Sequence, residues 1–274
     1  MRLIAFLFLL SAFASCQKEC PTCEKPEECP TCEKPEECAD SCKVDLTKGL
    51  LAYYPFNGSF NDASGNGNNG VATNGAYLST GFLGRANTAA AFDGNDDYII
   101  VNDNGKLSSD SVTVSLWVVA NSINRMQSIV TRSNFENTAG VSWGIGQSLN
   151  APNRWEFGVA KSSDDCQKLH VYDASIYCNS TQSINPGQWY HVLATFVNGV
   201  QKIYIDGVLK GTLTRDFKTL KKCSNAQFII GGWWKGGINS IDGKIDEVRI
   251  YNRGLSDCEI KELSTSFEES TLPK

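Results

Sequence analysis

The chain has 274 residues, of which 41% are hydrophobic and 20% are charged, so it is long enough to bury one large core or two small ones. Its net charge of -5 is uneven, because residues 17–42 carry three Lys and eight Asp or Glu and leave residues 43–274 nearly neutral. This distribution offers no basic surface for a nucleic acid.

The N-terminus predicts export. Arg2 precedes an apolar run, Leu3–Leu10, that is too short to span a bilayer and is followed by small residues. The letters "AFA" fit a cut before Ser15 by ordinary signal peptidase, whereas "FASC" is similar to a bacterial lipobox with a lipid on Cys16, although Phe stands where Leu is usual. The chain has 11 cysteines, and lipidation of Cys16 leaves ten that can all pair. We therefore predict a signal peptide over residues 1–15 and a lipid anchor, with ordinary secretion as the alternative.

A nine-residue unit, "CPTCEKPEE", is written twice over residues 20–37. Two CxxC pairs would suggest zinc if their thiolates stayed reduced, but the cysteines of exported proteins normally oxidise. The segment holds half of the eight prolines and almost no large apolar side chain, so it cannot build a core of its own. We predict that residues 16–43 form a solvated stalk rather than a metal site.

From Gly49 onward the sequence predicts an all-β domain over residues 44–270. Asn-Gly and Asp-Gly dipeptides, which favour tight turns, separate short apolar runs that alternate with polar residues. The predicted strands are "LLAYYPF", "DYIIV", "VTVSLWV", "QSIVTR", "RWEFGVA", "WYHVLATFV", "QKIYIDG", "FIIGG" and "GKIDEVRIY". Only "LSDCEIKEL" predicts a helix, because Ser256 and Glu259 have the spacing of a capping box.

Several of these motifs occur together in one known family. "GLLAYYPFNGSFNDASGNGNNG", "AAFDGNDDYIIV", "VTVSLWV", "GQWYHVLATFVNGVQKIYIDGVLKGT" and "GKIDEVRIYNRGLSDCEIKEL" appear in this order over about residues 49–264. Together they resemble the LamG-like jelly-roll domains of the concanavalin A-like lectin/glucanase superfamily. The resemblance implies a two-sheet antiparallel jelly-roll sandwich with a short C-terminal helix. It does not fix the function, because this fold serves lectins, adhesion modules, enzyme-appended modules and glucanases.

The sequence does not predict an enzyme. The glucanases of the superfamily place carboxylates at alternate positions of one strand, so that both point into one cleft. Asp246 and Glu247 are adjacent and leave opposite faces of a strand, and no Gly-x-Ser-x-Gly motif is present. His191 belongs to the family's structural pattern, which predicts a buried, hydrogen-bonded side chain rather than a general base.

An ion site is predicted from oxygen-bearing side chains. In "KIDEVRIY", Asp246 falls in phase with Val248 and Ile250, and a carboxylate on an apolar face needs compensation. The Gly-rich stretch "NDASGNGNNG" contains Asp62 and Asn68, and ligation by oxygen alone suits Ca²⁺. In the family that the chain resembles, this loop and the Asp of the last strand frame a structural calcium. The alternative is a turn closed by side-chain hydrogen bonds without an ion.

A ligand surface is predicted in "GGWWKGGINS". Trp233 and Trp234 are adjacent, so their rings cannot both point into one core, and exposed rings can stack on sugars. Core positions are predicted for the three tryptophans that lie within alternating strands: Trp143, Trp155 and Trp189. Trp117 is out of phase with the apolar face of its strand and is predicted to face elsewhere.

The remaining cysteines suggest two disulfides. Cys166 and Cys178 flank a loop that a bond would close, and Cys223 and Cys258 would then be left to pair. These features together predict a bacterial lipoprotein at the cell surface or outer membrane whose domain binds a glycan or an extracellular protein. The alternatives are a polysaccharide hydrolase or lyase, or a purely structural envelope protein.

Overall fold

The computed structural model describes residues 44–103, 105–136, 141–147, 153–164, 166, 177–235 and 238–265. The predictions of a signal peptide, of a lipid on Cys16 and of a stalk fall outside these residues. No helix in the described part of the chain has the length and apolar character needed to cross a bilayer.

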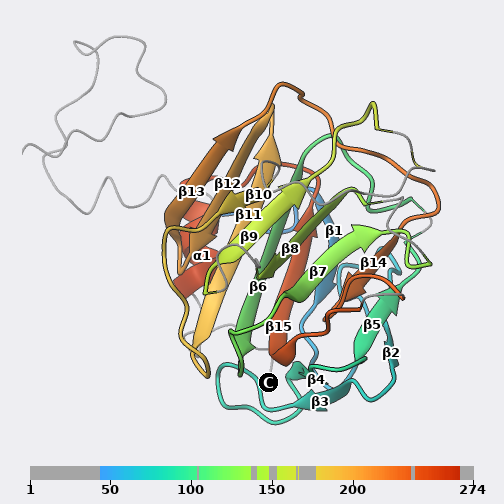
Figure 1. The fold of residues 1–274 in the computed structure, drawn as a ribbon, viewed down its shortest axis with the longest axis vertical. Helices are drawn as coiled ribbons and strands as arrows, with labels where there is room; N and C mark the ends of the chain where they lie inside the picture. Colours follow the sequence, from blue (N-terminus) through green and yellow to red (C-terminus); the bar gives the residue numbers. More distant parts are fainter. Residues whose placement is uncertain are drawn as a thin grey trace, which may run out of the picture. The chain divides into compact units, whose positions relative to one another are not determined.

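The described strands form two antiparallel sheets, which confirms the predicted jelly-roll sandwich (Figure 1). The eight-stranded sheet has the order β13-β12-β11-β6-β15-β4-β3, and β1 pairs with β15 beside this path. Its strands are β1 (Leu50–Tyr54), β3 (Tyr77–Ser79), β4 (Ala89–Asp93), β6 (Val112–Ala120), β11 (Trp189–Val197), β12 (Val200–Ile205), β13 (Val208–Thr214) and β15 (Asp242–Tyr251).

The seven-stranded sheet has the order β10-β9-β8-β7-β14-β5-β2. Its strands are β2 (Val71–Thr73), β5 (Tyr98–Val101), β7 (Gln127–Ser133), β8 (Trp143–Gln147), β9 (Trp155–Val159), β10 (Tyr177–Asn179) and β14 (Gln227–Ile230). Both sheets combine strands that are distant in sequence, as a jelly roll requires.

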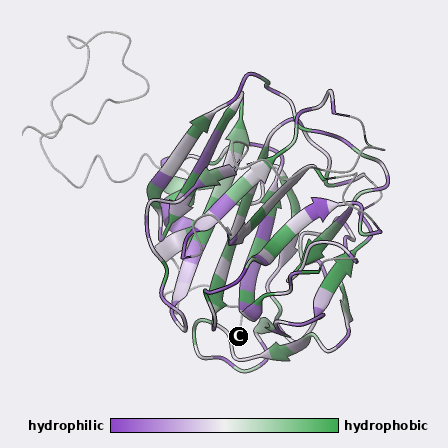
Figure 2. Cartoon of the chain, viewed as in Figure 1, coloured by the Kyte–Doolittle hydropathy of each residue, from purple (hydrophilic) through white to green (hydrophobic). Residues whose placement is uncertain are grey.

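The core lies between the two sheets. Alternate residues of β6, among them Val114 and Leu116, pack inward as the sequence predicts, and Trp143 and Trp155 meet them from the other sheet. All four side chains are almost inaccessible to water. Figure 2 shows the corresponding alternation of hydrophobic and hydrophilic residues along the strands.

Helix α1 (Asp257–Thr265) covers a second, smaller apolar cluster on the other side of the eight-stranded sheet. Its N-terminus has the predicted capping box: the Glu259 amide donates to the Ser256 hydroxyl, and the Ser256 amide donates to the Glu259 carboxylate. Arg253 donates two hydrogen bonds to that carboxylate, at 2.8 and 2.6 Å. Ile260 and Leu263 then pack on Tyr251 of the last strand.

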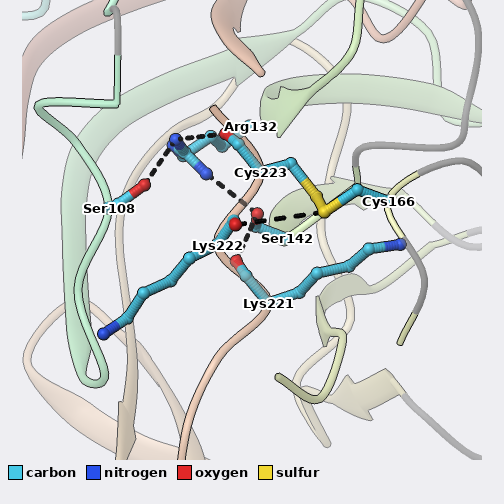
Figure 3. The surroundings of a disulfide bond; sticks show 7 residues. All are labelled: Ser108, Arg132, Ser142, Cys166, Lys221, Lys222 and Cys223. Carbon is cyan, nitrogen blue, oxygen red and sulfur yellow. Dashed lines mark hydrogen bonds between the residues drawn. A yellow bond between two sulfur atoms is a disulfide. The ribbon is translucent and has the colours of Figure 1, made fainter. Parts of the chain in front are cut away.

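The disulfide pairing differs from the prediction. Cys166 is bonded to Cys223, with 5.8 Å between their Cα atoms, although the two are 57 residues apart in sequence (Figure 3). Cys178 is buried in the core without a disulfide, and Cys258 is disulfide-bonded but not to Cys223. The predicted Cys166–Cys178 and Cys223–Cys258 pairs are therefore wrong. The physical reason is side-chain placement: Cys178 on β10 has its side chain in the core, whereas Cys166 is half-buried and does not belong to that core.

A fully buried guanidinium supports the segment around Cys223. Arg132 donates to the Asp103 carboxylate at 2.8 Å. It also donates to the hydroxyls of Ser142 and Ser108 and to the Cys223 carbonyl (Figure 3). Because every one of these partners is an acceptor, the buried charge is matched, which is the condition for keeping such a pair inside a protein. Through these hydrogen bonds, Arg132 holds the backbone of Cys223 in place next to the disulfide.

Candidate functional site

A shallow groove lies on the outer face of the seven-stranded sheet, over β7, β8 and β9. Its cavity has a volume of about 60 Å³ and its floor contains Gly144, Gly146 and Gly158. The register pairs Gly144 with Gly158 across two adjacent strands, so two positions that would carry outward side chains carry none. The large residues that alternate with these glycines along the strands, Trp143, Ile145 and Phe157, belong to the core. The groove therefore exists because large inward residues alternate with outward glycines.

Aromatic side chains form the walls. The ring of Tyr177 rests over Gly158, where a Cβ atom would lie 2.5 Å from a ring carbon. Trp233 lines the opposite part of the cavity, whereas Trp234 does not line it. Both tryptophans are half-buried. The structure thus separates the two residues that the sequence grouped together, and places Trp233 at a groove.

The segment that carries Trp233 is held from both sides. Gly231 leaves β14 with a φ of 83°, and a Cβ there would lie 2.2 Å from the ring of Phe92, so only glycine fits this bend. The Trp233 amide then donates to the Ile238 carbonyl at 2.8 Å, and the Lys235 amide donates to the Phe135 carbonyl at 2.8 Å. The indole is therefore presented from an anchored turn, as a preformed site requires.

Two hydroxyl groups in the groove are available to a ligand. Neither Ser128 nor Thr131 uses its hydroxyl in a hydrogen bond to another described residue, although both line the cavity. The glutamines beside them are committed to the fold: Gln127 donates to the Ser122 carbonyl and to the Gln147 side chain, at 2.6 and 2.7 Å. The hydroxyls can bond to a polar ligand without first breaking such contacts.

The groove holds a single carboxylate among its described lining residues. Glu156 is 5% exposed and pairs with Gly146 across the strands. Glycosidases of the usual kind need two carboxylates flanking the bond that breaks. Within the described part of the cavity, the paired carboxylates of a glucanase are not present.

The sequence analysis missed Tyr177, Thr131, Glu156 and the glycine floor, although two segments carried the signal. "WGIG" begins at Trp143 and "WEFG" begins at Trp155, and both alternate large apolar residues with small or polar ones. Glycine at outward positions of central strands indicates that something approaches the backbone closely. Only the pairing register, which the sequence does not contain, shows that the glycines adjoin.

Two further aromatic residues lie on the outer face of the other sheet. Trp117 is on that face, as its phase predicted, and stacks on Phe82 with ring centroids 4.3 Å apart and an interplanar angle of 7°. Trp189, predicted to be a core residue, is half-buried there and meets the edge of Phe82. The turn between β3 and β4 thus covers this face.

His191 adjoins Trp117 on the neighbouring strand and is 1% exposed. Its Nε2 atom forms a 2.9 Å hydrogen bond with the Ser115 hydroxyl. Burial lowers the pKa of His191 to about 3, and the positive charge of Arg249 acts in the same direction. The side chain is buried and hydrogen-bonded, as predicted, and its low pKa favours the neutral imidazole.

The prediction that Asp246 shares a face with Val248 and Ile250 is wrong. A β-bulge lies between Asp246 and Arg249, and Glu247 adopts a φ of 54° within it. The extra residue shifts the alternation by one position, so Asp246 pairs with Trp117 on the outer face while Val248 packs in the core. A bulge leaves no periodic signal in the sequence. The alternation of apolar and polar residues therefore predicted the wrong face for Asp246.

Asp246 is nevertheless 2% exposed, because the turn between β3 and β4 covers it. The Phe82 amide donates to its Oδ2 at 3.3 Å, and its Oδ1 accepts no hydrogen bond within the described part of the chain. Burial and, next, the adjacent Glu247 carboxylate raise the pKa of Asp246 to about 8. A buried oxygen without a partner needs an explanation, and a cation is one that fits a carboxylate.

Asp62 fits a cation less well. Its Oδ1 accepts the amides of Tyr53 and Ser64, at 3.0 and 2.8 Å, and its Oδ2 accepts the amide of Asn68 at 3.0 Å. These bonds close the Gly-rich loop in the way that the alternative without an ion predicts. The Oδ1 of Asn68 is buried and accepts no hydrogen bond from a described residue. Asp62 and Asp246 therefore have different partners, and the residue best suited to a cation is Asp246.

A second acidic group lies elsewhere. Asp93, Asp96 and Asp97 have carboxylate oxygens within 4.8 Å of one another, and two of these residues are exposed. The Asp93 carboxylate already accepts two hydrogen bonds from Asn95, and the Asp97 carboxylate accepts the Asp93 amide. The cluster is thus organised by its own hydrogen bonds.

Solved structures of similar fold include carbohydrate-binding domains. Domain 4 of AbnA, a GH43 extracellular arabinanase from Geobacillus stearothermophilus determined with arabinotriose, has a TM-score of 0.56 and 25% identity; the match covers 79% of this chain and 98% of that one. The binding domain of botulinum neurotoxin DC, determined with SialylT, has a TM-score of 0.58 and 16% identity, with 82% and 53% covered. The binding domain of Paraclostridial Mosquitocidal Protein 1 has a TM-score of 0.60 and 18% identity, with 81% and 53% covered.

The chain spans about half the length of these toxin domains, so they support the fold alone. No curated protein sequence is significantly similar to the chain. A family model described as the concanavalin A-like lectin/glucanases superfamily matches residues 93–261, which is more than half of the chain and includes every strand that forms the groove. The chain therefore belongs to the concanavalin A-like lectin/glucanase superfamily.

Proposed function

We propose that this domain binds carbohydrate in the groove over Gly144 and Gly158 and is not itself a hydrolase. The observation that carries the proposal is the combination of a glycine floor, aromatic walls at Trp233 and Tyr177, and the hydroxyls of Ser128 and Thr131, which form no hydrogen bond to another described residue. Sugars bind by stacking their apolar faces on aromatic rings while their hydroxyls form hydrogen bonds. The similar arabinanase domain was determined with arabinotriose, which agrees with a glycan ligand.

A glycan array tests this proposal, with Trp233→Ala and Trp234→Ala as a matched pair. Both rings are half-buried in the same turn, but only Trp233 lines the cavity. Loss of a stacked ring should weaken binding by roughly 1–3 kcal/mol, or tenfold to hundredfold. Trp234→Ala should bind as the unchanged protein does. Equal binding by both variants, each with an unchanged melting temperature, would move the site elsewhere.

We also propose that the protein is held at a bacterial cell surface or outer membrane by a lipid on Cys16. The support comes from the "FASC" motif and from the odd number of cysteines. A fatty-acid analogue fed to expressing cells should label the protein and should not label Cys16→Ser. Equal labelling of the two, or an intact protein whose first residue is Ser15, would instead indicate ordinary secretion.

A structural Ca²⁺ at Asp246 is a further part of the proposal. The buried Oδ1 supports it, because this oxygen accepts no hydrogen bond from a described residue, and the turn that covers Asp246 brings backbone groups close to the carboxylate. An ion there would brace the turn between β3 and β4 rather than take part in chemistry. The glycan groove lies on the opposite sheet, so binding would not require direct contact with this ion.

A further inference from the structure

The groove is too small for a whole sugar and too large for a single hydroxyl. A cavity needs roughly 10–15 Å³ to hold one water-sized group, so about 60 Å³ admits about four to six non-hydrogen atoms. A hexose with its hydroxyls is larger than this, whereas one substituent of the ring fits. The rest of the ring would lie at the mouth, beside Trp233 and Tyr177.

The chemistry of the lining limits which substituent can enter. The hydroxyls of Ser128 and Thr131 can each donate and accept a hydrogen bond, and Thr131 lies next to the glycine floor because it pairs with Gly144. Met126 and Val141 add apolar surface to the same cavity. The lining of the cavity is therefore complementary to a substituent that has a polar part and an apolar end.

We infer that this cavity receives the acetamido group of a 2-acetamido sugar, an inference that rests on the proposed carbohydrate binding. The amide has one acceptor and one donor for the two hydroxyls, and its methyl group would contact Met126 and Val141. With roughly four non-hydrogen atoms, the group matches the space available.

Other common substituents match less well. A carboxylate, as in uronic or sialic acids, would need a cation, and the described lining residues include no Lys, Arg or His. A bare hydroxyl would leave the apolar surface uncovered and most of the cavity filled with water. The groove should therefore discriminate by the presence of the acetyl group.

Saturation-transfer NMR with matched sugars tests the inference on the full-length protein. The probes are the methyl glycosides of glucose and N-acetylglucosamine and of galactose and N-acetylgalactosamine, which differ within each pair only in the acetamido group. We expect at least one acetylated sugar to bind roughly tenfold more tightly than its parent, because only the acetamido group both pairs with the two hydroxyls and covers the apolar lining. Its acetyl methyl protons should receive the strongest saturation.

Thr131→Val keeps the shape of the side chain and removes the hydroxyl, so it should weaken binding of the acetylated sugar roughly tenfold and reduce the preference for that sugar over its parent. Thr131→Ser restores a hydroxyl and should largely restore binding. If the acetylated sugar and its parent bind equally well, and Trp233→Ala weakens the binding of both, the inference of an acetamido site is overturned. The proposal of carbohydrate binding in the groove would still hold. Failure of every sugar on the probe set and on the glycan array would overturn both.

Discussion

His191 is the clearest case of a buried residue whose surroundings set its protonation state. It is enclosed next to Trp117, hydrogen-bonded to Ser115, and close enough to Arg249 for the two positive charges to disfavour each other. Because its pKa in the folded protein is about 3 and its usual value is 6.5, the unfolded chain takes up a proton at pH values where the folded chain does not. Acid therefore favours unfolding through this residue.

We expect the free energy of unfolding to fall as the pH is lowered from 6.5 toward 3, with a contribution from His191 of at most about 1.4 kcal/mol per pH unit. His191→Gln can retain the hydrogen bond to Ser115 but cannot take up a proton. Urea unfolding of the two proteins between pH 7 and 5 checks this. The variant should show the shallower dependence on pH, and identical slopes would contradict a buried neutral imidazole.

Single residues also show where the alternation of side chains along a strand fails to predict which face a residue occupies. The inward face of β6 and the core positions of Trp143 and Trp155 followed from alternation, because regular strands keep a period of two. Asp246 did not follow, since the bulge at Glu247 inserts a residue into β15. Trp189 also departed from its prediction, because a half-covered outer face and a core both accept a large apolar ring.

Among the elements, the turn between β3 and β4 contacts both Trp117 and Asp246 on the outer face of the eight-stranded sheet. Phe82 stacks on Trp117, and the amide of the same residue donates to Asp246. A cation on the carboxylate would therefore hold this turn closed as well as relieve the burial of charge.

If Ca²⁺ binds at Asp246, the melting temperature should rise with calcium concentration. At a hundredfold excess over Kd the gain is about 2.7 kcal/mol, or roughly 5–10 °C for a domain of this size. EDTA should reverse the rise, and Asp246→Asn should abolish the response. Asp96→Asn is the matched control from the other acidic cluster and should retain it. A melting temperature that ignores calcium and EDTA alike would rule out the site.

The disulfide shows that closeness in sequence does not predict which cysteines pair. Cys166 and Cys178 are near neighbours along the chain, yet Cys178 turns into the core on β10. Cys223 reaches Cys166 because its segment is positioned by the buried Arg132, whose guanidinium binds the Cys223 carbonyl. The capping box of α1 was predictable by contrast, because Ser256 and Glu259 interact within one helical turn.

For the molecule as a whole, the sandwich and its family were predictable, and the binding groove was only partly so. Turn dipeptides and alternating runs determine where strands start and stop, and five ordered motifs carried the resemblance. The groove depends on which strands lie side by side: Gly144 meets Gly158 only because β8 pairs with β9 in one register. Trp233 was recognisable as an unusual residue, but its distinction from Trp234 needed the structure.

The central claim is that carbohydrate binds over the glycine floor of the seven-stranded sheet. A crystal structure of the full-length protein with the tightest ligand from the glycan array tests it most directly. The account predicts a sugar at the mouth of the groove between Trp233 and Tyr177, with one substituent over Gly144 within hydrogen-bonding distance of Thr131. A sugar bound instead on the outer face of the eight-stranded sheet, beside Trp117 and Phe82, would contradict it.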